Sequence, residues 1–180
     1  MKNKTRDLEI RDLEIIVILH NIRSLHNVGS IFRTADATGV TRIYLCGITP
    51  APLDKFGRLR PQLAKVSLGA EKSVVWDGSA RSPRATIKLL GKLKSEGYKI
   101  FAVEQSKKST PYYRLRATNT KRKFALILGN EVKGLPPSIL KRADKVLEIP
   151  MKGRKESLNV AVAFGIVAFG LLYTKRRSYN

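Results

Sequence analysis

Short apolar runs alternate along this chain with longer stretches in which apolar positions recur at helical spacing. Continuous runs rich in β-branched or aromatic residues are typical of strands that are buried on both faces. The clearest run is IIVIL, at residues 15–19. The pattern predicts strands over residues 15–19, 42–46, 73–76, 99–103, 124–128 and 145–149.

The stretches between these runs predict helices. Val28, Ile31 and Phe32 form one apolar stripe, and Gly39 is placed to end the helix that carries it. Ser157 is placed to cap the last helix. Helices are expected over residues 28–38, in a short segment after Pro61, over 82–96 and over 157–173. Strands that alternate with helices predict an α/β fold with a mostly parallel sheet flanked by helices.

A single domain is expected. The 180 residues are within the usual size of one domain, and no internal stretch is long and polar enough to be a linker. Residues 1–14 include a tandem repeat of RDLEI and are interpreted as a short leader. Residues 15–180 are interpreted as the domain itself.

The charge of the chain points to a polyanionic partner. Lys and Arg number 35 against 14 Asp and Glu, which gives a formal net charge of +21. Residues 1–14 hold four bases and four acids, so residues 15–180 carry the whole excess, as 31 bases against 10 acids. A folded domain this basic repels itself unless a polyanion compensates, and nucleic acid is the usual one. An anionic membrane surface is the alternative.

The composition disfavours several classes of site and location. The single cysteine, Cys46, excludes an intramolecular disulfide, and with His20 and His26 it is too little for a zinc site, so no metal is expected. The first residues contain no apolar segment of the secretory kind, which favours the cytoplasm. The apolar run Val160–Tyr173 is short for a bilayer and is interpreted as a buried helix, so no membrane partner is expected.

Three polar loops follow predicted strands, at residues 20–33, 129–135 and 150–159. Ligands of a parallel α/β sheet bind at the carboxyl ends of its strands, so these loops are candidate site segments. A structural role, such as a helix cap at Asn27 or Ser157, is equally compatible with the residues. No G-x-G-x-x-G follows a strand, and no P-loop or G-x-S-x-G elbow is present, which disfavours dinucleotide-binding, P-loop and α/β-hydrolase functions.

These loops, in this order, resemble the three motifs of the SpoU (TrmH-type) branch of the SPOUT RNA methyltransferases. The first motif is NVGSIFRTADATG at residues 27–39, and the second is LGNEVKGL at 128–135. The third is IPM at 149–151 followed by ESLNVAVA at 156–163. The resemblance covers nearly the whole chain, with each motif after a strand-like run.

The resemblance implies a domain whose C-terminal part is tied in a deep trefoil knot, with S-adenosylmethionine as cofactor and a homodimer as the assembly. It implies methyl transfer to a ribose 2′-hydroxyl of tRNA or rRNA, with RNA as the partner. Carried over by position, the cofactor-binding residues are Val103, Gly129, Ile149 and Leu158. The catalytic and structural polar set is Asn27, Arg33, Glu131, Ser157 and Asn159.

Within this set, Arg33 is expected to clamp phosphate and ribose rather than to act as a base, because a guanidinium rarely gives up its proton. Glu131 is expected to hold the Arg33 fork in place, and Asn27 to fix its loop. The alternative is a non-catalytic RNA-binding or ribosome-assembly protein on the same scaffold. Cofactor-dependent labelling of RNA distinguishes the two.

Overall fold

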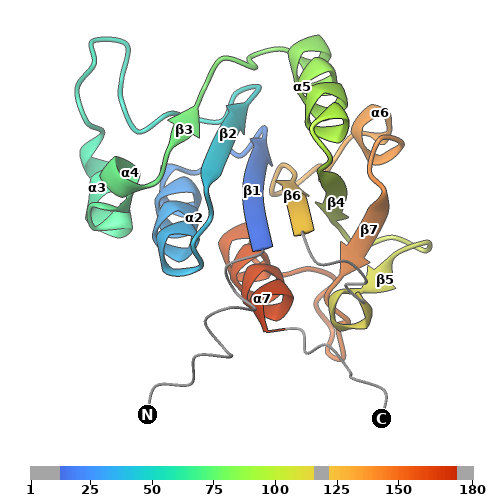
Figure 1. The fold of residues 1–180 in the computed structure, drawn as a ribbon. Helices are drawn as coiled ribbons and strands as arrows, with labels where there is room; N and C mark the ends of the chain where they lie inside the picture. Colours follow the sequence, from blue (N-terminus) through green and yellow to red (C-terminus); the bar gives the residue numbers. More distant parts are fainter. Residues whose placement is uncertain (1–12, 116–121, 174–180) are drawn as a thin grey trace, which may run out of the picture.

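The computed structural model describes residues 13–115 and 122–173 (Figure 1). Almost all of the expected leader therefore lies outside the described residues. Within these ranges seven strands form one sheet, and every strand pairing in it is parallel. This confirms the α/β class and the parallel sheet predicted from the sequence.

The strand order across the sheet is β3-β2-β1-β6-β4-β7-β5. The strands are β1 (Leu13–His20), β2 (Arg42–Cys46), β3 (Trp76–Asp77), β4 (Lys99–Val103), β5 (Thr110–Pro111), β6 (Arg122–Leu128) and β7 (Lys145–Glu148). The strand predicted at 73–76 is mostly wrong, since a helix ends at Ser73 and β3 begins only at Trp76. The two-residue strand β5 was not predicted, because it contains no apolar run.

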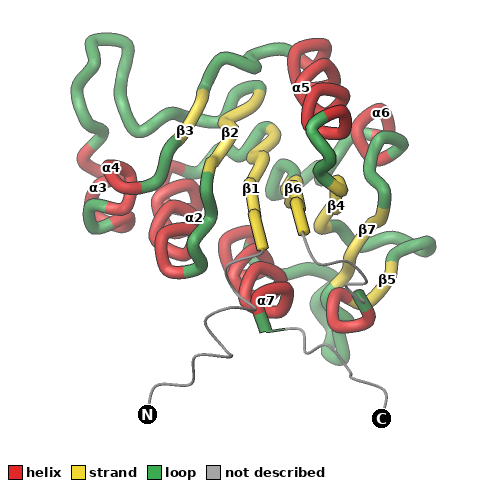
Figure 2. The backbone as a smooth tube through the Cα atoms, in the orientation of Figure 1, coloured by secondary structure: helices red, strands yellow, loops and turns green. Residues whose placement is uncertain are grey.

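Helices cover both faces of the sheet (Figure 2). They are α2 (Leu25–Ala37), α3 (Pro61–Ser67), α4 (Ala70–Ser73), α5 (Pro83–Ser95), α6 (Pro137–Leu140) and α7 (Val160–Leu172), with a 3₁₀ turn η1 (Tyr112–Arg114). Four of them, α2, α3, α5 and α7, correspond to the predicted helices. The other two have a single turn each, which is too short for a helical period to show in the sequence.

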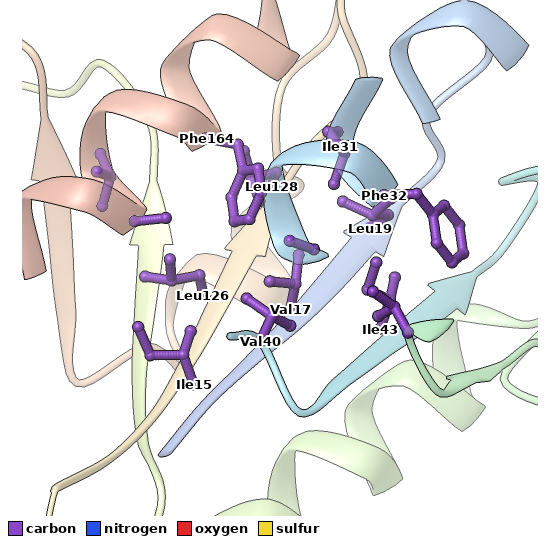
Figure 3. Packing of buried hydrophobic residues seen from close by; sticks show 14 of the residues in the cluster. Ile15, Val17, Leu19, Ile31, Phe32, Val40, Ile43, Leu126, Leu128 and Phe164 are labelled. Atoms are coloured by element: carbon purple, nitrogen blue, oxygen red, sulfur yellow. The ribbon is translucent and has the colours of Figure 1, made fainter. Parts of the chain in front are cut away.

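The central strand β1 is buried on both faces. Val17 and Leu19 belong to the cluster that includes Phe164 of α7 (Figure 3), whereas Ile16 and Ile18 belong to the cluster on the α5 side. Successive side chains of a strand point to opposite faces, so a strand between two helical layers is apolar at every position. This explains why the first apolar run of the chain does not alternate with polar residues.

The parallel arrangement places the candidate loops along one edge of the sheet. The neighbouring strands β1, β6, β4 and β7 all have their carboxyl ends on this side of the sheet, because parallel strands run in the same direction. The loops after β1, β6 and β7 are the three polar segments singled out in the sequence. They therefore leave the sheet close to one another.

The N-cap residues of two helices differ from those expected. Ser24 caps α2, where its Oγ accepts a hydrogen bond from the backbone N of Asn27 at 3.2 Å, so Asn27 lies inside the helix. Asn159 caps α7, where its Oδ1 accepts hydrogen bonds from the backbone N atoms of Ala161 and Val162. Ser157 precedes this helix and does not cap it, because the helical run begins only at Val160.

The last helix, α7, is apolar on all sides. Phe164, Val167 and Leu171 face the core, whereas Val162 and Phe169 remain 51% and 40% exposed. The prediction of a buried helix is therefore right for one face only. No helix within the described ranges combines the length and the hydropathy that crossing a membrane requires.

Candidate active site

A cavity of about 310 Å³ lies beside the ends of β4, β6 and β7. Residues from all three candidate loops line this cavity. This agrees with the rule that a parallel α/β sheet binds its ligands at the carboxyl ends of the strands. Eight of the nine site residues predicted from the sequence belong to its wall. They are Asn27, Val103, Gly129, Glu131, Ile149, Ser157, Leu158 and Asn159. The ninth, Arg33, lies elsewhere.

Gly129 is the point at which the chain turns away from β6 into the second loop. It is buried, and a Cβ atom at this position would lie 2.5 Å from the carbonyl carbon of Gly134 and 2.6 Å from the backbone N of Leu135. No side chain fits there, since both neighbours are backbone atoms. The loop closes on itself only because residue 129 is glycine.

The carboxylate of Glu131 joins the second loop to the first. Its oxygens accept hydrogen bonds from the backbone N of Arg23 at 3.1 and 3.2 Å and from the backbone N of Ser24 at 3.2 Å. The side-chain Nδ2 of Asn27 donates a further hydrogen bond at 3.1 Å. These donors surround the start of α2, where an anion is also favoured by the helix dipole.

Asn27 carries the connection on to the third loop. Its Oδ1 accepts a hydrogen bond from the Nδ2 of Asn159 at 3.0 Å. Because Asn159 also caps α7, the three loops and the starts of two helices are held by one chain of hydrogen bonds. Asn27 is 8% exposed, whereas Asn159 is exposed, so the link is buried only on the Asn27 side.

Hydrogen bonding lowers the pKa of Glu131. Burial by itself raises the pKa, because it penalises the charged form, but hydrogen bonds from the backbone amides of Glu131, Arg23 and Ser24 and from the side-chain amide of Asn27 outweigh it. The net pKa is below the ordinary value of a glutamate. The carboxylate is therefore ionised in the folded protein at neutral pH.

Arg33 lies on the exposed side of α2, in an open groove next to the cavity. Its guanidinium makes no hydrogen bond or salt bridge within residues 13–115 and 122–173. The groove is lined by Arg23, Ser24, Leu25, His26, Arg33, Gln62, Lys65 and Val66, with no carboxylate among them. The groove and the cavity adjoin at Ser24, whose backbone N–H points to Glu131.

The expectation that Glu131 holds the Arg33 fork is wrong. The lone pairs of Glu131 are taken by two backbone amides and by Asn27, all of which precede or open α2. Arg33 lies about two turns further along the helix, on the groove side. The expectation for Asn27 is closer to the structure, since its side chain does tie its own loop to the other two.

Four polar residues that line the cavity are absent from the predicted site set: Glu104, Gln105, Asn130 and Glu148. Glu104 and Gln105 directly follow β4 and line the cavity. Glu104 accepts a hydrogen bond from the backbone N of Leu135, and Gln105 donates one from Nε2 to the carbonyl of Ile149 at 2.8 Å. Applying the strand-end rule to β4 as well would have identified both.

The two histidines have different surroundings. His20 is buried beside Thr86, and burial lowers its pKa, which favours the neutral ring. His26 is exposed in the groove, where it is the second residue of α2. Within the part of the chain that the structure describes, no group of three His, Cys, Asp or Glu residues is placed to hold a metal ion.

The close approach at Gly129 predicts a large effect of one methyl group. Gly129→Ala should lower the free energy of unfolding by about 2 kcal/mol, because backbone atoms must move to admit the new Cβ. Gly153→Ala is the matched control, since its Cβ would have no neighbour within 4 Å. The control should stay within about 0.5 kcal/mol of the wild type in chemical denaturation. Equal stabilities of the two variants would contradict this account of the second loop.

The lowered pKa of Glu131 predicts a pH-dependent contribution to stability. The ionised group stabilises the fold above its ordinary pKa of about 4.3, and this contribution is lost as the pH falls through the lower pKa of the folded state. The free energy of unfolding should therefore fall less for Glu131→Gln than for the wild type between about pH 6 and pH 3. Denaturation curves at both pH values measure the difference. Glu156→Gln, at an exposed position of the third loop, is the control. Its free energy of unfolding should fall over this pH range as much as that of the wild type does.

Comparison with known proteins agrees with the motifs and the fold. The sequence model of the SpoU rRNA Methylase family matches residues 14–169. A tRNA (guanosine(18)-2′-O)-methyltransferase of Aquifex aeolicus is 32% identical over 170 residues, which cover 94% of this chain and 74% of that protein. A 23S rRNA (guanosine-2′-O-)-methyltransferase of Neisseria meningitidis is 33% identical, and the match covers 85% of this chain but only 56% of that protein. The chain thus spans little more than half of the second relative.

Solved structures lead to the same assignment. The TrmH/SpoU tRNA modifying enzyme of Aquifex aeolicus has a TM-score of 0.74 and 31% identity, covering 94% of this chain and 79% of its own. An AdoMet-bound rRNA methyltransferase of Sinorhizobium meliloti has a TM-score of 0.75 and 29% identity, covering 92% and 58%. With the family motifs gathered around one cavity and the family model matching most of its length, the chain belongs to the SpoU family of RNA methylases.

Proposed function

We propose that the protein is an S-adenosylmethionine-dependent methyltransferase that acts on a ribose 2′-hydroxyl of tRNA or rRNA. One observation carries the proposal: the three family motifs converge on a single cavity, directly beside a cationic groove without carboxylates. The names of the relatives support the same reaction and both classes of RNA. A chain with a net charge of +21 suits such a substrate.

The residues of the cavity suit S-adenosylmethionine. Its wall combines apolar side chains, such as Leu128 and Leu147, with backbone groups and the polar residues Glu104 and Gln105. This mixture fits a ligand with an aromatic base, a ribose and an amino-acid tail, which needs no phosphate cradle. An AdoMet-bound relative supports this choice of cofactor. When bound, the cofactor supplies a methyl group that its sulfonium has already activated.

The backbone positions are proposed to bind this cofactor. Val103 ends β4, Gly129 follows β6 and Ile149 follows β7, and all three line the cavity. Gln105 holds Ile149 in place through its hydrogen bond to the Ile149 carbonyl. Leu158 is 38% exposed and supplies an apolar contact from the third loop.

The polar residues are proposed to place and activate the ribose. Arg33, free of partners in the described chain, is available to bind the RNA phosphate and to stabilise negative charge that develops on the 2′-oxygen. A guanidinium stays protonated, so the proton of the hydroxyl passes to the phosphate or to water. Glu131, Asn27 and Asn159 keep the wall between groove and cavity in position, and Ser157 lies at the cavity rim.

The reaction itself is tested by incubating the protein with RNA and isotope-labelled cofactor. Transfer of label to alkali-resistant ribose positions is expected, and their mapping identifies the modified nucleotide. RNA that binds without any labelling would favour a non-catalytic RNA-binding or ribosome-assembly protein instead.

Because Arg33 lies outside the cavity, its loss should reduce methyl transfer without weakening cofactor binding. Arg33→Ala should lower methyl transfer at least about a hundredfold, because the charge that stabilises the reacting oxygen is lost. Cofactor affinity, measured by calorimetry, should stay within about twofold of the wild type. Arg84→Ala, at another exposed helical arginine, should change neither quantity. Wild-type turnover in Arg33→Ala would contradict the role proposed for this residue.

A homodimer is proposed as the assembly. The exposed residues Val162, Phe169 and Tyr173 lie on one face of the last helix and its end, opposite the face that packs into the core. An apolar face of this kind is typical of a subunit interface. Val160 and Ala163 of the same helix line the cavity, so a partner seated on this helix would lie close to the site.

Sedimentation tests the assembly. The wild type should sediment as a species of about twice the 20.1 kDa of the chain. Phe169→Glu should shift it toward the monomer, because an unpaired charge within an apolar interface is costly. Val75→Glu places the same charge at a site 53% exposed near the sheet edge and should leave the dimer intact. A monomeric wild type at micromolar concentration would contradict the proposal.

The trefoil knot and the cytoplasmic location stay predictions. The strand order is compatible with a knotted C-terminal part, since β6 is inserted between β1 and β4, and β7 between β4 and β5.

A further inference from the structure

The connection between β2 and α3 presents an aromatic side chain to solvent. Residues 47–60 extend away from the sheet as a long loop (Figure 2). Phe56 lies in the turn between Leu53 and Leu59, which form an antiparallel bridge, and 67% of its surface is exposed. Because this phenylalanine is exposed, the fold does not gain the hydrophobic free energy that burying its side chain would contribute. Neither the cavity nor the core uses this side chain.

The turn that holds Phe56 is ordered by its own hydrogen bonds. The Asp54 carboxylate accepts from the backbone N of Phe56 at 2.8 Å and from the backbone N and the Nε of Arg58 at 3.0 and 3.1 Å. Gly57 adopts a left-handed φ of 75°, which closes the turn, and Leu53 pairs with Leu59 in an antiparallel bridge. The loop thus presents Phe56 on a defined turn.

Two cations accompany the exposed ring. The Nζ of Lys55 is 4.9 Å and the Cζ of Arg58 is 4.8 Å from the centre of the Phe56 ring. Cations at this distance are attracted to the π-face. An exposed ring with two side-chain cations over it matches a nucleotide, whose base takes the place of a cation on the ring and whose phosphate binds that cation.

The loop is continuous with the cationic groove. It leaves the carboxyl end of β2 and returns directly into α3, whose Gln62 and Lys65 line the groove together with Arg33. A polymer held by its phosphates in this groove therefore has the loop as its neighbour. A small molecule in the cavity or a compact protein ligand would not need to contact the loop of residues 47–60 as well.

We propose that Phe56 is a stacking platform for an unpaired RNA base that flanks the nucleotide at the site, with Lys55 and Arg58 binding the adjoining phosphates. The inference deepens the proposed function, on which it rests for the identity of the polymer. It also assigns a substrate preference. RNA with an exposed, unpaired base near the target binds better than a continuous duplex, whose bases have no free face.

The test measures binding of two probes without cofactor. The probes are a short single-stranded RNA oligonucleotide of mixed sequence and the same sequence as a duplex, each end-labelled for fluorescence anisotropy. Phe56→Ala and Phe56→Leu should weaken binding of the single strand about tenfold, equivalent to about 1.4 kcal/mol. Phe56→Tyr should keep wild-type affinity, because it restores the aromatic face. Duplex affinity should change by less than about twofold in every variant.

A second measurement reports stacking directly. Trp76 is the single tryptophan of the chain, so Phe56→Trp in a Trp76→Phe background leaves one indole, at position 56. Its fluorescence should be quenched by the single-stranded probe and not by the duplex. Ile48→Ala, which removes a 66% exposed apolar side chain from the same loop, is the matched control and should bind both probes as the wild type does.

Three results would overturn the inference. They are wild-type binding of the single strand by Phe56→Ala and Phe56→Leu, an equal loss for the duplex, or a change in sedimentation that makes Phe56 a contact between chains. None of these readouts uses methyl transfer. A failure of the proposed reaction and a failure of the stacking platform are therefore distinguishable.

Discussion

The arrangement of this protein depends on the carboxylate of Glu131. It follows β6, yet its hydrogen bonds are made with groups that precede and open α2, more than a hundred residues earlier in the chain. Through Asn27 the same set of hydrogen bonds reaches Asn159 at the start of α7. A parallel sheet brings the three loops together at the carboxyl ends of its strands, but this proximity does not fix how the loops are placed relative to one another. The Glu131 carboxylate fixes this arrangement, because amide donors from another segment bind it. The three loops therefore form one wall of the cavity.

Most of the fold was predictable because buried parallel strands have to be apolar on both faces. This rule located β1, β4 and β6 within two residues at either end. It failed for β3, at the edge of the sheet, where only two residues pair with β2 and hydrogen bonding rather than composition sets the bounds. The shift of the last helix has a related cause. Ser157 and Asn159 are both suitable N-cap residues, and only the contact between Asn159 and Asn27 decides between them.

The site was predictable to the extent that family motifs mark sequence positions. The cavity contains eight of the nine expected residues, whereas the partners of Glu131 and the groove around Arg33 were not foreseen. Which side of a helix a residue occupies can be deduced from spacing, but which distant backbone amides meet a carboxylate cannot. Glu104 was a different kind of omission, because the rule that would have found it was applied to only some of the strands.

Asn159 couples the seating of the last helix to the shape of the site. One atom of its side chain, Oδ1, caps α7, while another, Nδ2, donates to Asn27 in the wall between groove and cavity. Any force that slides or rotates α7 along the core consequently pulls on that amide. A partner that moves α7 on docking changes the affinity of the cavity for its ligand, and thermodynamic linkage makes the influence equal in both directions.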